Sequence, residues 1–571
     1  MYDEDEPILG GSNSYYKERS IPMNNNNNTQ PSTKAGDKEI ETVVESSGSS
    51  IKSEKLNVFH KLNQLSKKLD AIGVEARGIE RIQSYERSTN PTKQFISVIG
   101  LWLSGCGGLS SMSSFYLGPL LFGLGLKNCM ISGMIGQAIG CAIAAYLALM
   151  GPRSGCRQMV SARFLFGWWF VRIVALAAIV GVMGWSVVNC VVGGQILMSV
   201  SDNKIPLVGG IIIISGISLI FAMFGIKQVL RFEAALAIPV NLAFLLLYIS
   251  ASDKFSYLSN ANSPLDDAAT LKGNWLSFFS LCYAITSTWG SVASDYYILF
   301  PENTPDVQVY FITFFGILLP TSFVGVIGSL IGNVAMNYQP WNDAYAEAGM
   351  GGLLFKAFER WNGGGKFLLM VIFISLISNN IINTYSACFG IQLFGGFLTK
   401  IPRWFWSIVV TIVYMVCALV GRNKFSTILS NFLPMVGYWI SMYFMILLEE
   451  NTIFRTNRFK HLFIHEFPSD KFTERPQEKE LHSTNIRLNQ HYNFDIWNDP
   501  SKITNGYAAT LAFCCGVAGA VLSMSQTYWI GPIAKAVGGE FGGDVAMWLS
   551  MGFSGVVYPF LRYIELKKFG R

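Results

Sequence analysis

The most constraining feature of the sequence is a run of apolar residues as long as a lipid bilayer is thick. Between Phe367 and Thr399 the chain contains no Lys, Arg, Asp or Glu. A helix of about 20 mostly apolar residues spans the hydrocarbon core of a bilayer, where a lone helix satisfies its own backbone hydrogen bonds. The stretch is therefore predicted to be a transmembrane helix.

Eleven other stretches have the same character. The twelve predicted spans are residues 94–118, 123–150, 164–200, 206–225, 234–251, 275–300, 309–336, 367–397, 404–420, 428–448, 507–529 and 545–563. Only 14% of all residues are charged and 51% are hydrophobic, whereas soluble proteins carry about 25% charged residues. The chain is therefore predicted to be an all-α polytopic membrane protein with 12 transmembrane helices.

The rest of the chain divides around these spans. Residues 1–93 are predicted to form an N-terminal tail, mostly disordered because residues 1–56 are polar and of low complexity, followed by a more helical pattern. Residues 94–448 would hold the first ten helices, residues 449–505 a charged loop, and residues 506–571 the last two helices. Most basic residues fall in the connections on the side of both chain ends, so the positive-inside rule predicts cytoplasmic termini.

Two predicted spans contain residues that interrupt helices. Gly105, Gly107 and Gly108 lie inside the first span beside a run of serines, and Thr288 and Gly290 lie inside the sixth. Interrupted helices at matching positions of two halves indicate a transporter built from inverted repeats, here five helices plus five. The alternative interpretation is that small residues only allow close helix packing.

Three asparagines lie within the long apolar run. Asn379 and Asn383 are four residues apart, and Asn380 and Asn383 are three apart, so all three are expected near one helix face. A buried amide costs free energy unless it is hydrogen bonded. Asparagines can join helices in membranes, but a cluster of three favours a binding site for a small polar molecule.

An indole and an amide lie together in the third span. Trp185 and Asn189 are separated by one helical turn, and Trp289 lies at the interruption of the sixth span. Two indoles can stack on a planar heteroaromatic ring while amides bond its edge. An ordinary buried Trp with an incidental Asn neighbour is the alternative, but together with the three asparagines the binding-site interpretation is favoured.

The coupling ion has two kinds of candidate site. Glu233 and Asp295 are carboxylates near the ends of the fifth and sixth spans, and either could exchange a proton or be an ordinary interfacial charge. Ser375 and Ser378 could instead line a sodium site. The sequence contains no nucleotide-binding GxxxxGK[ST] loop, and its five histidines lie in polar segments. Neither a pump, an enzyme, a cofactor nor a resident metal is predicted.

Several stretches resemble a known family. SSFYLGPLLFGLGL, GPRSGCRQMVSARFLFGWW, GWSVVNCVVGG, FGIKQVLRFE, WGSVASDYYILFP and ISNNIINTYSACFG are similar to the nucleobase–cation symporter family, in its fungal purine–cytosine permease branch. The resemblance implies a LeuT-like five-plus-five core, two further C-terminal helices, and proton-coupled uptake of a small heteroaromatic solute. It also implies a substrate site containing Trp185, Asn189, Trp289, Asn380 and Asn383, with Asn379 beside them as a packing residue.

The first span departs from the nucleobase permeases at its interruption. The resemblance implies an asparagine at this interruption, as in the nucleobase permeases, but this chain has Gly105-Cys106-Gly107-Gly108. Gly107 and Gly108 are therefore expected beside a ring with bulky substituents. Within the branch, the quoted stretches most resemble the fungal transporters that take up vitamin B6 (pyridoxine) at the plasma membrane. A purine or cytosine permease is the alternative, and a non-transporting nutrient sensor is a third hypothesis.

Overall fold

The computed structural model describes residues 78–88, 90–224, 226–263, 267–467 and 491–571. All of these belong to one compact unit, His60–Arg571, while a second unit, Met1–Phe59, lies outside the described residues. The predicted disorder of residues 1–56 and the helical pattern that follows them therefore also lie outside the described residues, apart from the short helix η1 (Ser84–Glu86).

The described chain is mostly helical. Its main helices are α2 (Pro91–Cys106), α3 (Leu109–Phe115), α4 (Leu117–Leu120), α5 (Leu126–Ala148), α6 (Met150–Ser154), α7 (Gln158–Ser161), α8 (Arg163–Val200), α9 (Leu207–Ala222), α10 (Ile226–Ala251), α11 (Ala268–Ser287), α12 (Asp306–Asn337), α13 (Gln339–Ala357), α14 (Asn362–Gln392), α15 (Arg403–Gly421), α16 (Phe425–Glu449), α18 (Tyr507–Ser523), α19 (Pro532–Gly538) and α20 (Ala546–Phe569). The short helices used below are η3 (Thr288–Ser291), η4 (Ala293–Tyr296) and η8 (Glu450–Phe454), and β1 (Ser525–Gln526) pairs antiparallel with β2 (Trp529–Ile530).

Each of the twelve predicted segments corresponds to a helix or to a broken helix. Within the described part of the chain, six helical stretches are long and apolar enough to cross a membrane, or seven when α2 and α3–α4 are counted as one bent span. One of the six, Arg403–Phe454, contains both α15 and α16. The twelve-span count remains a prediction, because α9 and α18 are shorter than the usual span, and α11 and α20 are not among these stretches.

The predicted interruption of the first span is confirmed. α2 ends at Cys106, and the chain resumes at Leu109 with a bend of 43°. The break leaves the carbonyl oxygen of Leu103 available, and the amide of Asn241 on α10 donates to this oxygen at 3.2 Å. A Cβ atom on Gly107 would lie 2.4 Å from the same oxygen, so the break tolerates no side chain there. A neighbouring helix thus satisfies the freed backbone, as the interior of a membrane protein requires.

The sixth predicted span is interrupted as well. α11 ends at Ser287, and the tighter turns η3 and η4 follow it. The hydroxyl of Thr286 donates to the carbonyl oxygen of Gln137 on α5 at 2.8 Å, and that of Thr288 donates to Ala284 within α11. The two interruptions lie side by side, since a Cβ on Gly105 would be 3.3 Å from the indole of Trp289.

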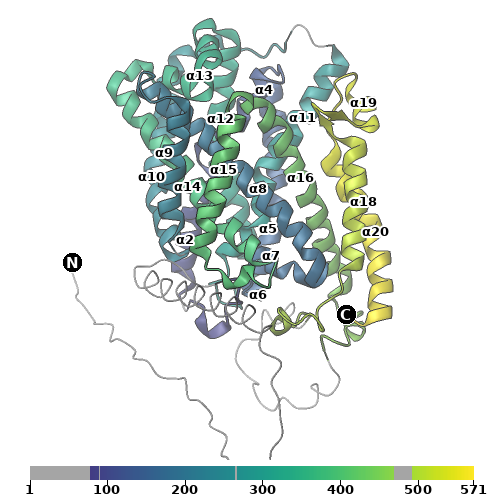
Figure 1. Cartoon of the computed structure of the whole chain (residues 1–571). Coiled ribbons are helices and arrows are strands. Elements are labelled where there is room, and N and C mark those ends of the chain that lie inside the picture. The colour runs from purple at the N-terminus through teal and green to yellow at the C-terminus, as the bar shows by residue number, and fades with distance from the viewer. Residues whose placement is uncertain (1–77, 89, 225, 264–266, 468–490) are drawn as a thin grey trace, which may run out of the picture. The chain divides into compact units, whose positions relative to one another are not determined.

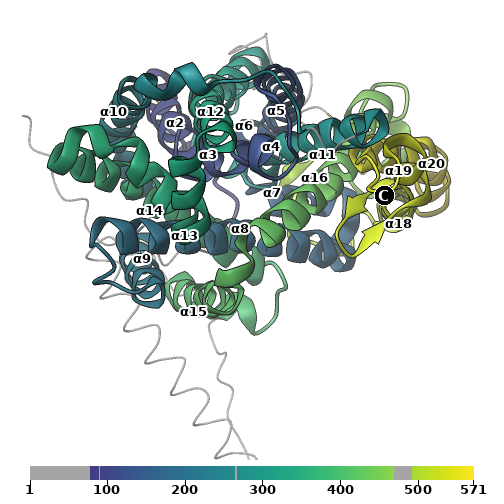
Figure 2. The same cartoon turned by 90° about the horizontal axis from the view of Figure 1, so that it is seen from above.

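The helices surround these two interruptions. α5 packs along α11, α8 along α14, and α10 along α2, while α18 and α20 pack on each other at one edge next to α16 (Figure 2). The start of α2 and the end of α20 lie at the same end of the helices, the lower end in Figure 1. We call this end the terminal face. It also carries α6, α7 and the end of α14.

One helix was not expected. The connection between α12 and α14 reads as a mixed-sign loop, but the structure folds Gln339–Ala357 into α13, which packs against α8. α13 is broken at Gly349, whose φ of +62° brings its backbone against the side chain of Gln195. A left-handed residue at a close backbone approach favours glycine, so this break has a clear local cause.

Candidate functional site

A small buried cavity lies where the two interrupted spans, α2–α3 and α11–η3, meet α8 and α14. It is lined by Ser110, Ser111, Val182, Trp185, Ile285, Thr288, Trp289, Val292, Asn379 and Asn383. Its volume of about 20 Å³ has room for about one water molecule. A larger ligand therefore enters only when the surrounding helices separate. We call this space the central cavity.

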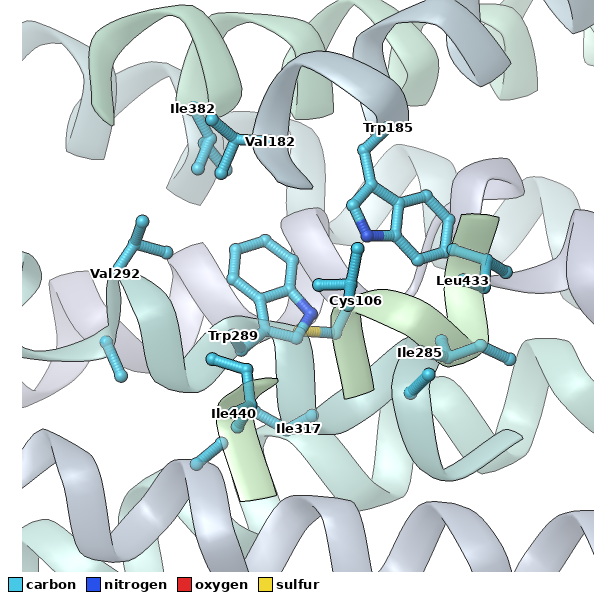
Figure 3. Packing of buried hydrophobic residues seen from close by; sticks show 14 of the residues in the cluster. Cys106, Val182, Trp185, Ile285, Trp289, Val292, Ile317, Ile382, Leu433 and Ile440 are labelled. Carbon is cyan, nitrogen blue, oxygen red and sulfur yellow. The ribbon is translucent and has the colours of Figure 1, made fainter. Parts of the chain in front are cut away.

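Two indoles form the flat walls of the central cavity. Trp185 comes from α8 and Trp289 from η3, and both project toward the same space in Figure 3. They are 6% and 8% exposed. The ring of Trp102 meets that of Trp289 edge to face at a centroid distance of 5.5 Å, and its Nε1 donates to the hydroxyl of Tyr297 at 3.2 Å. The Trp289 indole is thus held from behind.

Asn379 is the centre of a hydrogen-bond network at the polar wall. Its Oδ1 accepts from Nδ2 of Asn189 at 2.8 Å, from Nδ2 of Asn383 at 2.9 Å and from Oγ of Ser110 at 3.4 Å. Its Nδ2 donates to the backbone carbonyl oxygen of Gly105 at 3.3 Å. The freed backbone of the first interruption is thereby joined to α8 and α14.

Asn189 and Asn380 lie behind this wall and do not line the cavity. Nδ2 of Asn189 also donates to Oδ1 of Asn380 at 3.0 Å, and Nδ2 of Asn380 lies 3.4 Å from Oγ of Ser218 on α9. Successive residues of a helix are turned by about 100°, so Asn380 faces away from its neighbour Asn379. Among the described residues, Oδ1 of Asn189 has no hydrogen-bond partner although the residue is fully buried.

Part of the cavity wall was not among the predicted site residues. Ser110 and Ser111 line it from α3, although the serine run that contains them was already visible in the sequence. Val182, Ile285 and Val292 complete the apolar part, and such residues carry no signal that distinguishes a cavity wall from ordinary packing. Thr288 also belongs to the wall.

Gly107 and Gly108 form the interruption rather than the lining of the central cavity. A Cβ on Gly107 would meet Leu103 and Asn241, and one on Gly108 would lie 3.1 Å from the Ser375 side chain. The two glycines therefore allow α10 and α14 to approach the broken backbone closely. They directly precede α3, which carries Ser110 and Ser111.

Glu233 lies beside the first interruption, not at an exposed helix end. The residue is fully buried on α10, and the hydroxyl of Ser378 on α14 donates to its Oε2. Ser378 is also 3.1 Å from the hydroxyl of Ser104 on α2. Within the described part of the chain, Oε1 of Glu233 has no hydrogen-bond partner. Through Ser378, which directly precedes Asn379 in the sequence, this carboxyl group connects α10, α14 and α2.

The second candidate carboxylate, Asp295, does not lie beside the first interruption as Glu233 does. Asp295 lies on η4 toward the terminal face, where it accepts from the backbone N–H of Gln158 at 2.7 Å and lies 4.0 Å from Arg157. Ser375 is already committed, since its hydroxyl donates to the carbonyl oxygen of Ile372 and accepts from the N–H of Leu109. No group of three metal-ligating His, Cys, Asp or Glu side chains occurs among the described residues.

The central cavity combines two flat aromatic walls with amide and hydroxyl groups and no charged side chain. Indoles favour stacking on planar rings, while amides and hydroxyls can both donate and accept hydrogen bonds. An uncharged lining suits a ligand that carries no phosphate or carboxylate. The geometry thus suits a small, flat, polar ring.

Comparison with known proteins gives consistent results. The model of the family described as permease for cytosine/purines, uracil, thiamine and allantoin matches residues 86–461. The chain is 59% identical over 534 residues to the vitamin B6 transporter TPN1 of Saccharomyces cerevisiae, covering 90% of this chain and 91% of that protein. It is 28% identical over 516 residues to the purine-cytosine permease fcyB of Emericella nidulans, covering 90% and 93%.

A solved structure shares the fold. Mhp1, a nucleobase-cation-symport-1 family transporter in a closed conformation with bromovinylhydantoin bound, superposes with a TM-score of 0.59 at 13% identity, covering 87% of this chain and 97% of Mhp1. The family and these relatives are membrane transporters, not enzymes. This chain is accordingly a multi-pass membrane protein, and it belongs to the family of permeases for cytosine and purines, uracil, thiamine and allantoin.

Proposed function

We propose that this protein takes up vitamin B6, pyridoxine and related vitamers, across the plasma membrane and that the uptake is driven by the proton gradient. The central cavity carries the proposal, because two indoles and two asparagines enclose an uncharged space. The 59% identity to a yeast vitamin B6 transporter supports the same substrate. Pyridoxine is a planar pyridine with hydroxyl and hydroxymethyl groups, so it matches both kinds of wall.

In the proposed bound state the pyridine ring stacks between Trp185 and Trp289. Its polar edge then meets the amide of Asn383 and the hydroxyls of Ser110 and Ser111, while Asn379 holds Asn383 in place. The helices must first separate, since the central cavity has room for about one water molecule. Closure around the substrate would then exclude water from the amide hydrogen bonds, as alternating access requires.

Proton coupling is assigned to Glu233. Its carboxyl group can take up a proton, and its hydroxyl partner Ser378 precedes Asn379 directly in α14. A neutral carboxyl group donates a hydrogen bond, whereas a carboxylate only accepts. Protonation would therefore reverse the bonding between Glu233, Ser378 and Ser104, and so change how α10, α14 and α2 are joined beside the substrate.

The function is tested with labelled pyridoxine in yeast cells that lack their own transporter. Cells expressing this protein should accumulate pyridoxine, and a protonophore should abolish accumulation, while replacement of external sodium should have no effect. Glu233→Gln should abolish accumulation against a gradient but retain exchange of internal for external pyridoxine. Protonophore-resistant or sodium-dependent accumulation would contradict proton coupling, and absence of pyridoxine uptake would contradict the substrate.

A second candidate is a purine or cytosine permease. The similarity to fungal purine-cytosine permeases at 28% identity supports it, since nucleobases are also flat rings with polar edges. In the same cells, excess cytosine or adenine would then inhibit pyridoxine uptake and would itself be transported. We expect neither nucleobase to compete.

A further inference from the structure

A second buried cavity lies next to the central cavity on the side of the terminal face. Val182 and Val292 line both cavities, so their side chains form the partition between them; both are labelled in Figure 3. The second cavity continues along α14 past Asn383 to Ser386 and Phe389. Its volume is also about 20 Å³. We call it the lower cavity.

A buried ion pair forms part of the wall of the lower cavity. Arg157 and Asp295 line it and are only 5% and 4% exposed. One Nη of Arg157 lies 4.0 Å from the Asp295 carboxylate, and the other donates to the hydroxyl of Tyr385 at 2.9 Å. The 4.0 Å separation is longer than a charge-assisted hydrogen bond.

The guanidinium of Arg157 covers an aromatic face inside this cavity. Its Cζ lies 3.3 Å from the centroid of the Phe389 ring. A guanidinium is a flat group that stacks on aromatic rings much as another ring does. The hydroxyls of Ser291 and Ser386 line the same space, and that of Ser386 is 3.3 Å from the hydroxyl of Tyr296. The lower cavity thus shares an aromatic ring and nearby hydroxyls with the central cavity, but it also contains an ion pair and lacks asparagines.

We propose that the lower cavity is an exit site for the transported heteroaromatic ring. The ring leaves the two indoles, passes between Val182 and Val292, and stacks on Phe389 after the Arg157 guanidinium has moved aside toward Asp295. Ser291 and Ser386 bond its hydroxyl substituents before release at the terminal face. The inference rests on the proposed function for the direction of transport and for the ring as substrate.

The alternative is that Arg157, Asp295 and Phe389 only fasten α7, η4 and α14 together. The two readings differ in sidedness. An exit site contributes to affinity only when the protein is open to the terminal face, whereas a fastening changes stability and both transport directions together. Half-saturating concentrations measured separately from the two sides of the membrane therefore distinguish them.

The test uses the full chain in membrane vesicles of known orientation, with Phe389→Leu as the variant. The half-saturating concentration for exchange from the terminal-face side should rise about two- to tenfold, the effect of losing one aromatic stacking contact. The value from the opposite side should not change, and maximal uptake should fall. Phe373→Leu is the matched control, because Phe373 is a buried residue of the same helix that lines neither cavity.

Ser386→Ala provides a second variant with a smaller structural change. It should give the same one-sided rise through the loss of one hydroxyl, even where Phe389→Leu reduces the amount of folded protein. Equal changes from both sides, or no change from either side, in both variants would overturn the exit site. The assay uses whichever labelled ring the unaltered protein transports, so transport of cytosine instead of pyridoxine would contradict the proposed substrate and still test the exit site.

Discussion

At the scale of single residues, position on α14 decides which asparagine lines the central cavity. Asn379 and Asn383 line the central cavity, whereas Asn380 lies behind it against α9. The spacing of the three asparagines was readable from the sequence, but their rotation was not. α14 is buried on most sides over this stretch, so no polar face indicates which way the helix is turned.

Asn383→Ala tests the polar wall. Removal of the amide leaves a polar group of the bound ring unpaired, which costs about 1–3 kcal/mol. We expect the half-saturating pyridoxine concentration to rise roughly 5- to 150-fold at unchanged surface abundance, measured by uptake and surface labelling. Unaltered uptake kinetics would mean that Asn383 contributes packing only.

Trp185 tests the aromatic wall. Trp185→Ala removes the stacking surface, so we expect a higher half-saturating concentration and a smaller change in maximal rate. Trp185→Phe keeps a ring and should lie between the alanine variant and the unaltered protein. Aromatic contacts contribute about 0.5–1.5 kcal/mol beyond burial, so the alanine variant should lose at least about twofold in affinity. Kinetics equal to those of the unaltered protein in both variants would exclude stacking on Trp185.

At the scale of elements, the two interruptions are the features that the sequence predicts best. Glycines and hydroxyl residues in the middle of an apolar span can also allow close helix packing, but here the structure breaks both spans at these residues. The helix α13 was missed because it lies in a connection of mixed charge with weak apolar periodicity. The partner that satisfies the first break, Asn241, was also missed, because only the packed structure brings α10 beside α2.

Gly107→Ala tests the first interruption. The added Cβ would lie 2.4 Å from the carbonyl oxygen of Leu103 and 3.0 Å from Pro320, so the backbone must shift. Overpacking of this kind costs about 1–3 kcal/mol. We expect a lower melting temperature of the purified protein and loss of uptake. Gly216→Ala is the control, since a Cβ on Gly216 meets nothing within 4 Å. Equally low melting temperatures for Gly216→Ala and Gly107→Ala would contradict the steric argument.

At the scale of the whole described unit, a buried network of charges joins the last helix to the rest. Glu450 on η8 accepts from Arg562 on α20 at 3.1 Å, from Arg455 at 3.0 Å and from the hydroxyl of Tyr558 at 2.8 Å. The twelve apolar segments were readable in order from the sequence. Pairings such as this one could not be predicted from the sequence, because the partners are far apart along the chain. The sequence pattern places these charged residues in loops or at the chain end.

Arg562→Gln tests this network. Arg562 also bonds Glu565, so its removal leaves two buried carboxylates with less compensation. Breaking one partner out of a buried ion pair costs about 3–5 kcal/mol, whereas an exposed pair contributes about 0–1 kcal/mol. We expect a large fall in melting temperature for Arg562→Gln and almost none for Lys366→Ala, whose pair with Asp202 is exposed. Similar melting temperatures for both variants would contradict the assigned role.

Binding to the purified protein shows whether the Trp and Asn walls of the central cavity bind the ring of vitamin B6. The measurement is competition of labelled pyridoxine by unlabelled pyridoxine, cytosine and adenine, for the unaltered chain and for Asn383→Ala. We expect displacement by pyridoxine alone and a large loss of binding in Asn383→Ala. Displacement by cytosine or adenine at similar concentrations, or unchanged binding in Asn383→Ala, would contradict it.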